Sequence, residues 1–278
     1  MLDFKVDREK CISCGACAAD CPATIIDMRD GYPLIRKENE KRCYRCQHCL
    51  AICPTAAISI LGRDPLNSQP LAGNLPQPQQ LATLMRGRRS VRRYLDENLD
   101  PQLINELLNA AWHAPSGHNA RPVHFHLIDD REVMALLREL AYAGIRVNAE
   151  QAKLPVRLAF FKEFVPVWEK SGLDVVFRGA PHLLIASAPK RVASSEADCM
   201  IALAHFELMA QSSGIGTLWN GLAKWTIEKI VPELRDRLGI PQDHGIGYCM
   251  SFGKPAIVYH RTVQYDEVPI RRITGIGD

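Results

Sequence analysis

Apolar residues at helical spacing follow the dipeptide Asp100-Pro101. Aspartate is a preferred helix N-cap and proline suits the first helical turn, so we expect a helix to begin there. Its apolar face is made of residues three or four positions apart, namely Leu103, Ile104, Leu107, Leu108 and Ala111. The sequence APSGHN at 114–119 contains turn-forming residues and predicts the end of this helix.

Two further stretches have a regular pattern. Residues 123–129, VHFHLID, alternate apolar side chains with histidines, which is the period of a β-strand. Residues 196–211 carry apolar side chains almost all round at helical spacing, which predicts a helix buried on more than one side. Helical and strand patterns alternate from about residue 81 onward, so this part is expected to form one domain over 81–278.

The N-terminal part of the chain is dominated by cysteine. Eight of the ten cysteines lie within the first 53 residues, where they form an internal repeat. Each copy has the spacing Cys-x2-Cys-x2-Cys-x3-Cys-Pro. The first copy contains Cys11, Cys14, Cys17 and Cys21, and the second contains Cys43, Cys46, Cys49 and Cys53.

This spacing is typical of [4Fe–4S] ferredoxins. Three thiolates on a tight loop reach three iron corners of one cubane, and the fourth points to the other cubane. One cluster is therefore expected on Cys11, Cys14, Cys17 and Cys53, and the other on Cys43, Cys46, Cys49 and Cys21. Zinc sites usually use two cysteine pairs, and disulfide scaffolds distribute their cysteines over the fold, so both alternatives are disfavoured. Residues 3–60 resemble bacterial two-cluster ferredoxins, and we expect a small ferredoxin-like domain over 1–60.

Residues 61–80 contain four prolines and two glycines with little periodicity, which predicts an extended, semi-rigid linker. The segment RGRRSVRRY at 86–94 follows it, with five arginines in eight positions. Three interpretations of the arginines stay open from the residues alone. They form a solvated basic turn, a nucleic-acid patch, or a clamp in which guanidinium forks and the Ser90 hydroxyl hold a phosphate.

The chain from about 81 to 265 resembles the FMN-dependent nitroreductase family. The family has an R-x-S-x-[RK] motif before its first helix and an A-P-S-x-x-N-x-Q-P-W-x-F loop after it. This sequence has RRSVR at 88–92 and APSGHNARPVHF at 114–125. Further matches are GIGTLWNG at 214–221 and FGKP at 252–255. The resemblance implies an α+β fold with a central antiparallel sheet flanked by helices.

The resemblance also implies an FMN site. Arg88, Ser90 and Arg92 would hold the phosphate, Arg261 would close the clamp, and Lys254 is a weaker candidate for the same role. FMN is expected to sit between the subunits of a homodimer, with the helix at 196–211 in the interface; a core helix of a monomer is the alternative.

Other residues are assigned to the isoalloxazine and ribityl region. Pro115, Ser116 and Asn119 would line it, with Asn119 at the polar edge of the ring. Asn220 and Gly221 match the loop whose backbone N–H lies near flavin N5.

Two residues of the same loop have alternative roles. His118 is either a proton donor to the substrate or a solvated loop histidine. The family's glutamine is Arg121 here and its tryptophan is Val123. The Arg121 side chain is expected either near the flavin or in solvent, with no preference between the two.

Composition limits the remaining function classes. The formal net charge of +3 is too small to imply nucleic acid or an anionic membrane as the main partner. No apolar run is long enough to span a bilayer, and the charged N-terminus does not resemble a secretory signal, so a cytoplasmic protein is expected.

The sequence therefore predicts an oxidoreductase. Electrons pass from two [4Fe–4S] clusters to FMN and then, as hydride, to a small organic acceptor such as a nitroaromatic, a quinone or an activated alkene. The first alternative is an NAD(P)H-reduced flavoprotein that exports electrons through the clusters. The second is a redox sensor or electron carrier without its own substrate.

Overall fold

The computed structural model describes residues 2–275, which form two compact units. The first unit contains the chain up to Pro76 together with residues 115–122, and the second contains residues 77–114 and the chain from Val123 onward. No described helix is both long and apolar enough to cross a membrane.

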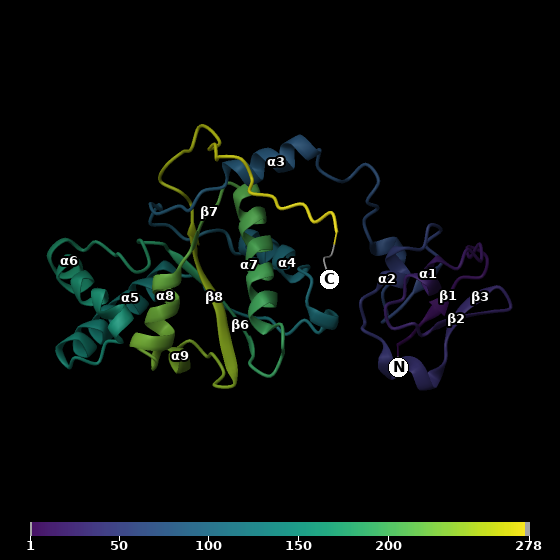
Figure 1. Ribbon diagram of the computed structural model, residues 1–278, viewed down its shortest axis with the longest axis horizontal. Helices are drawn as coiled ribbons and strands as arrows, with labels where there is room; N and C mark the ends of the chain where they lie inside the picture. Colours follow the sequence, from purple (N-terminus) through teal and green to yellow (C-terminus); the bar gives the residue numbers. More distant parts are fainter. Residues whose placement is uncertain (1, 276–278) are drawn as a thin grey trace. The chain divides into compact units, whose positions relative to one another are not determined.

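The first unit is built from two small antiparallel ribbons and short helices (Figure 1). Strand β1 (Lys5–Val6) pairs with β4 (Ile58–Ser59), and β2 (Ile26–Arg29) pairs with β3 (Tyr32–Ile35). Its helical segments are α1 (Ala16–Ala19), η1 (Lys37–Arg42), α2 (His48–Ala51), η2 (Pro65–Asn67) and η3 (Gly117–Asn119). A core of isoleucines and cysteines fills the space between them.

The second unit contains one four-stranded antiparallel sheet in the order β5-β6-β8-β7. Its strands are β5 (His124–Ile128), β6 (His182–Pro189), β7 (Gly216–Trp219) and β8 (His244–Gly253). Its helical segments are α3 (Pro78–Gly87), α4 (Pro101–Trp112), α5 (Arg131–Glu150), η4 (Val156–Glu163), α6 (Phe164–Ser171), α7 (Ser195–Ser212), α8 (Gly221–Trp225), η5 (Thr226–Ile230) and α9 (Leu234–Arg237).

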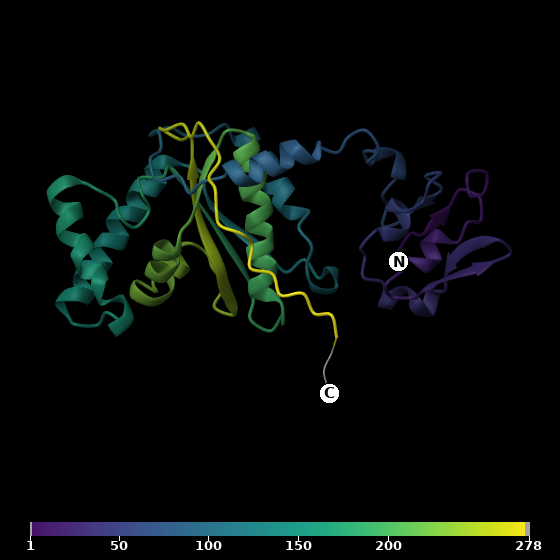
Figure 2. The same cartoon turned by 45° about the horizontal axis from the view of Figure 1, so that its top comes forward.

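Helices cover both faces of this sheet (Figures 1 and 2). On β6, Leu183 and Ile185 pack into the core formed with α5, α6 and η5, whereas Leu184 and Ala186 pack into the core formed with α4 and α7. This alternation follows from the strand period of two. The α+β fold with a central antiparallel sheet expected from the sequence is confirmed.

The helix expected after Asp100 is α4, and the Asp100 side chain accepts a hydrogen bond from Gln102 N at 2.9 Å. The helix expected at 196–211 is α7. One face of α7 is buried, but Met200 is 41% exposed, Ile201 37% and Met209 37%. Its second apolar face therefore lies on the surface of the single chain. The sequence predicted a helix buried on more than one side, and the structure differs from that prediction at this face.

Candidate iron–sulfur and flavin sites

Two separate cavities in the first unit are lined by cysteine. The first cavity has Cys11, Cys14, Cys17 and Cys53 in its wall. The second cavity has Cys21, Cys43, Cys46 and Cys49 in its wall. Each cavity thus takes three cysteines from one run and the fourth from the other run.

The two cysteine runs also have similar backbone φ angles at equivalent positions. Ser13 and Arg45 occupy equivalent positions with φ of 56° and 55°, and Gly15 and Gln47 follow with φ of 72° and 61°. These left-handed residues turn the chain so that α1 and α2 begin directly afterwards. Cys17 and Cys49 are each 7% exposed as a result. Only Gly15 signalled such a turn in the sequence, because three of the four positions are not glycine.

The environment of the thiols fits a bound cluster. Burial raises the pKa of Cys49 to about 12, and burial also raises the pKa of Cys17 and Cys43. Backbone N–H groups donate to sulfur at Cys43, from Arg45 at 3.3 Å, and at Cys53, from Ala57 at 3.2 Å. Thiolates in an apolar wall require a compensating cation, and N–H donors to sulfur are the usual surroundings of iron–sulfur ligands.

In the second unit, the arginine-rich segment is fixed to its neighbours by Arg88. Arg88 Nη1 donates to Glu207 Oε1 on α7 at 3.0 Å, and Thr217 Oγ1 on β7 donates to the same oxygen at 3.3 Å. Glu207 is only 6% exposed, so it is a buried anion beside a partly exposed guanidinium. No local pattern in the sequence links Glu207 to Arg88.

Ser90 lies next to the start of β7. It forms a parallel bridge with Thr217, and Val91 N donates to Thr217 O at 2.9 Å. The carbonyl oxygen of Ser90 accepts from Arg92 Nη1 at 3.3 Å and from the Tyr259 hydroxyl at 3.5 Å. Arg92 and Ser90 are therefore adjacent, as a phosphate clamp requires.

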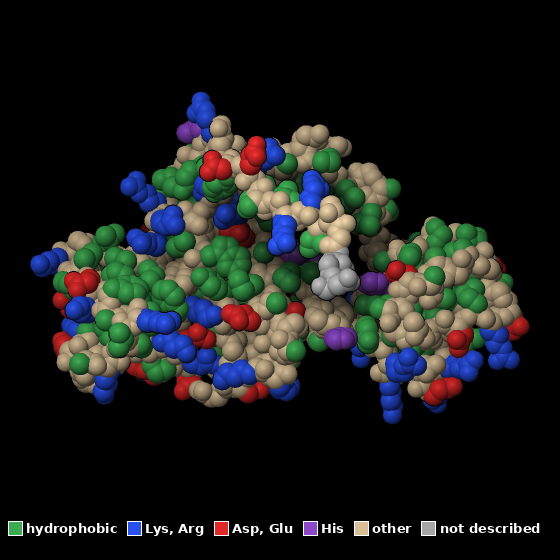
Figure 3. All heavy atoms as spheres, viewed as in Figure 1, with side chains coloured by type: hydrophobic (Ala, Val, Ile, Leu, Met, Phe, Trp, Pro, Cys, Tyr) green, Lys and Arg blue, Asp and Glu red, His purple; other side chains and the backbone are tan. Residues whose placement is uncertain are grey.

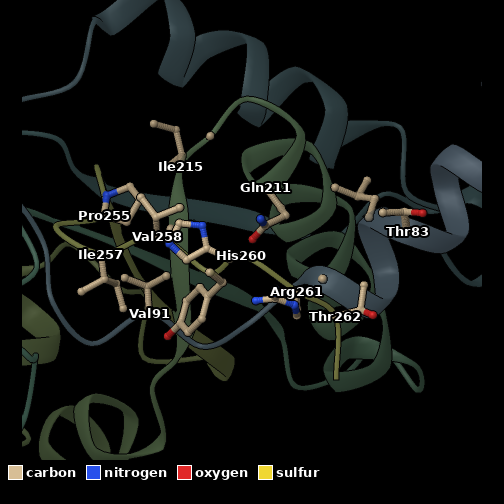
Figure 4. A pocket seen from close by; sticks show the side chains of 15 residues that line it. Thr83, Val91, Gln211, Ile215, Pro255, Ile257, Val258, His260, Arg261 and Thr262 are labelled. Atoms are coloured by element: carbon tan, nitrogen blue, oxygen red, sulfur yellow. The ribbon is translucent and has the colours of Figure 1, made fainter. Parts of the chain in front are cut away.

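Arg261 lines a cavity of about 520 Å³ together with Val91, and the wall also includes parts of α3, the end of α7 and residues 255–262 (Figure 4). This cavity adjoins the arginine-rich segment. Lys254, which precedes Pro255 of this wall, is in an exposed ion pair of 3.1 Å with Glu97. The structure thus brings Arg88, Ser90, Arg92 and Arg261 to one region of the unit, and a donor set of guanidinium and hydroxyl groups fits the phosphate of FMN.

The loop at 115–122 belongs to the first unit. Its Ser116 Oγ accepts from Arg121 N at 2.9 Å, and the Asn119 side-chain amide donates to Tyr44 O at 3.0 Å. The His118 ring meets the Tyr44 ring edge-on, with 5.6 Å between centroids. Pro115 is exposed. Sequence reasoning had not linked this loop to the cysteine-rich segment.

Asn220 is 3% exposed, and its side chain is fully engaged within the protein. Its Nδ2 donates to Val176 O and Ser251 Oγ, both at 2.9 Å, and its Oδ1 accepts from Ala223 N at 2.9 Å. The side chain therefore caps α8 and fixes the loop. Gly221 is the first residue of α8, where a backbone N–H has no partner within the helix.

Comparison with known proteins assigns both units. Residues 85–254 match the nitroreductase family, and residues 10–58 match a 4Fe-4S dicluster domain. Because the first match covers more than half of the chain, the protein belongs to the nitroreductase family. It is an FMN-dependent oxidoreductase with an N-terminal iron–sulfur domain of the ferredoxin type.

Individual relatives are distant. A protein of Archaeoglobus fulgidus, assigned by name to the NADH dehydrogenase/NAD(P)H nitroreductases, is 28% identical over 60% of this chain and 81% of its own length. The iodotyrosine deiodinase of Danio rerio is 26% identical over 66% of this chain and 62% of its own length. The crystal structure of an FMN-bound nitroreductase from Bacteroides fragilis has a TM-score of 0.56 and 24% identity, and covers 69% of this chain and 99% of its own. This structural likeness shows the shared fold.

Proposed function

We propose that the first unit binds two [4Fe–4S] clusters, that these deliver electrons one at a time to FMN in the second unit, and that the flavin reduces a small organic acceptor. The observation that most supports this proposal is the pair of separate four-cysteine cavities in a chain that also has the nitroreductase fold. Nitroaromatics, quinones and activated alkenes are the proposed acceptors. Bound FMN supplies the two-electron hydride chemistry that no side chain of the protein can perform.

Residues of the second unit hold the phosphate of the flavin and face its N5 edge in this proposal. Arg88, Ser90, Arg92 and Arg261 hold the phosphate, and Lys254, which lies outside the R-x-S-x-[RK] motif, is the weakest of the candidates. The Gly221 N–H faces the flavin as a donor that stabilises its reduced form. Pro115, Ser116 and Asn119 remain candidates for the ring region, and His118 for proton donation to the acceptor.

A homodimer completes the proposal. The exposed face of α7 carries apolar residues at helical spacing: Ala197, Met200, Ile201 and Ala204. Apolar side chains are visible on the surface around the position of α7 (Figure 3). A second copy of the chain is the partner that a buried flavin between subunits requires.

Phosphate binding is tested by FMN affinity. Arg88→Ala and Arg92→Ala each remove a charge-assisted hydrogen bond, so the Kd for FMN should rise about 10- to 100-fold. Arg86→Ala is the matched control, because Arg86 is exposed on α3 in the same arginine-rich segment. If FMN affinity is unchanged in the Arg88 and Arg92 variants, the phosphate of FMN binds at another place in the protein.

The direction of electron flow is tested by anaerobic absorbance titration. If reduced ferredoxin bleaches the flavin while NAD(P)H does not, the clusters are the electron entrance. If NAD(P)H bleaches the flavin first and the clusters follow, the protein exports electrons through the clusters, as the first alternative holds. A flavin that accepts electrons but reduces no small acceptor favours the sensor or carrier alternative.

The relay itself is tested by removing a cluster ligand. Cys11→Ser and Cys43→Ser should each lower the iron content and slow flavin reduction by reduced ferredoxin, while FMN stays bound. Cys199→Ala is the control, because Cys199 is a buried thiol of the second unit that lines neither cavity. Unchanged flavin reduction in both ligand variants would reject the relay.

A further inference from the structure

Two equivalent turns follow the last cysteines of the two runs in the first unit. The sequence is CPAT from Cys21 and CPTA from Cys53. In the first turn, Thr24 N donates to Cys21 O at 2.9 Å, and in the second turn, Ala56 N donates to Cys53 O at 3.2 Å. Thr24 and Ala56 also have similar φ angles, 49° and 52°. The two turns therefore have the same backbone and differ in their side chains.

The third residue of each turn lies against a cavity. Thr55 lines the first cavity, and its Oγ1 lies 3.7 Å from the sulfur of Cys53. Ala23 has the equivalent position and lines the second cavity with a methyl group. A sulfur bound to iron carries no proton, so the Thr55 hydroxyl is the donor in this contact when a cluster is bound.

The backbone donors to sulfur also differ between the two cavities. Ala57 N donates to the sulfur of Cys53 at 3.2 Å, beside the Thr55 hydroxyl. In the second cavity, Arg45 N donates to the sulfur of Cys43 at 3.3 Å. Within residues 2–275, the sulfur of Cys21 accepts no hydrogen bond. One ligand of the first cavity therefore has both an N–H and an O–H donor, a combination without an equivalent at Cys21.

Positive charges near the second cavity act against this difference. Arg45 is exposed, so solvent and salt screen its guanidinium. His48 lines the second cavity, but its Nδ1 lies 3.1 Å from Asp20 Oδ2, and the carboxylate offsets a positive charge on the ring. The Thr55 hydroxyl, in contrast, contacts a ligand sulfur directly within the cavity wall. We therefore expect the direct contact to have the larger effect.

We propose that Thr55 raises the reduction potential of the cluster in the first cavity, so that this cluster accepts the first of two electrons. Reduction adds one negative charge to a cluster, and hydrogen bonds to its sulfur ligands stabilise that charge. The inference rests on the part of the proposed function that assigns one cluster to each cavity. It adds the order in which the two clusters are reduced and the residue that determines this order.

The step transfers one electron and no proton. A reduced ferredoxin-type protein loses one electron, and the first-cavity cluster gains it. The iron–sulfur bonds remain intact, and the Thr55 hydroxyl keeps its proton while it donates to the more negative sulfur of Cys53. A second electron from the same kind of donor then reduces the second-cavity cluster at a lower potential.

The test is an anaerobic redox titration of the full-length, cluster-loaded protein, followed by electron paramagnetic resonance. Thr55→Val removes the hydroxyl and keeps the shape of the side chain, and Thr55→Ala introduces the residue found in the other turn. In both variants, the ratio of reduced to oxidised first-cavity cluster at a fixed potential should fall about three- to tenfold, which corresponds to about 30–60 mV. Thr55→Ser retains the hydroxyl and should keep the wild-type midpoint potential.

Two further variants assign the signals and control for the loss of a hydroxyl. Cys11→Ser removes a ligand of the first-cavity cluster alone, so the higher of the two wild-type midpoints should be missing from this variant. Thr24→Ala is the matched control, because the Thr24 hydroxyl donates to the carbonyl oxygen of Ala23 at 2.9 Å and not to a sulfur. Both midpoints should be unchanged in Thr24→Ala.

Two outcomes would overturn the inference. One is that both midpoints are unchanged in Thr55→Val and in Thr55→Ala, with the iron content of the wild type. The other is that the higher midpoint remains in Cys11→Ser. A wild-type protein that holds iron for a single cluster would contradict the proposed function itself, and iron analysis of the same samples distinguishes that failure from the other two.

Discussion

Arg88 donates a hydrogen bond of 3.0 Å to the carboxylate of Glu207, which lies 119 positions further along the sequence. The pair joins the arginine-rich segment to α7. Because Thr217 donates to the same carboxylate oxygen, β7 is joined to the pair as well. One buried carboxylate therefore positions the first arginine of the proposed phosphate clamp relative to the central sheet.

Replacing Glu207 should weaken this arrangement. Glu207→Gln removes the buried anion and leaves Arg88 without its charged partner. We expect the free energy of unfolding to fall by about 1–3 kcal/mol, the range for losing one member of a partly buried charge-assisted pair. Chemical denaturation followed by tryptophan fluorescence measures this. Glu106→Gln, an exposed glutamate on α4, is the control, and an equal loss in both variants would contradict the assignment.

The side chain of Asn220 is expected to be structural. Asn220→Ala removes the N-cap of α8 and the bonds to Val176 and Ser251, and should lower the free energy of unfolding by about 2–4 kcal/mol. Asn220→Asp retains the oxygen that accepts from Ala223 but places a carboxylate at a buried site beside the carbonyl oxygen of Val176, so it should be no more stable than the alanine variant. Denaturant midpoints of the three proteins test this order. An alanine variant with the wild-type midpoint would argue against the capping role.

The exposed face of α7 predicts the oligomeric state. Met200→Glu and Ile201→Glu place charges in the proposed subunit interface and should shift the mass in solution from dimer to monomer. FMN content should fall with it, because the proposed flavin site lies between subunits. Analytical ultracentrifugation with absorbance detection reads both quantities. Val133→Glu is the control, on an exposed apolar residue of α5. A wild-type protein that is monomeric with bound FMN would remove the basis of this proposal.

Acidic pH should destabilise the second unit through the half-buried His126 and the buried His182. Burial lowers the pKa of His126 and of His182. His126 contacts Ser187 Oγ at 2.8 Å, with His244 on the other side of the same hydroxyl, and His182 Nε2 accepts from Leu99 N at 3.1 Å. The unfolded chain binds protons from about pH 6.5 downward, whereas the folded chain resists them, so stability falls as the pH drops below that value.

This prediction is tested with His126→Gln, which retains a polar side chain but does not titrate. The loss of stability between pH 7 and pH 5 should be smaller in the variant than in the wild type. Both proteins have the same first unit, so the difference between their pH profiles isolates the histidine. His205→Gln, an exposed histidine of α7, should give the wild-type profile. Parallel profiles for His126→Gln and the wild type would show that this ring does not contribute.

The sequence was most informative where chemistry requires a fixed local spacing. The cysteine runs predicted which four thiols line each cavity, because ligand spacing determines what a short loop can reach. Arg88 and Ser90 were found by a motif, but Glu207 was not, since a contact over such a sequence separation leaves no local pattern. The loop at 115–122 was assigned to the flavin from its motif alone. Its bond to Tyr44 depends on left-handed residues such as His118 and Asn119, which no simple pattern signals.

The exchange of cysteines between the two cavities has a consequence for biosynthesis. When only the first cysteine run has been translated, the chain contains three of the four cysteines that line the first cavity. The fourth, Cys53, is the last cysteine of the second run. The wall of the second cavity likewise lacks Cys49 until the second run is translated, although its Cys21 belongs to the first run. Neither wall is complete until nearly the whole repeat has been translated. The proposed clusters are therefore expected to be inserted after translation of the repeat.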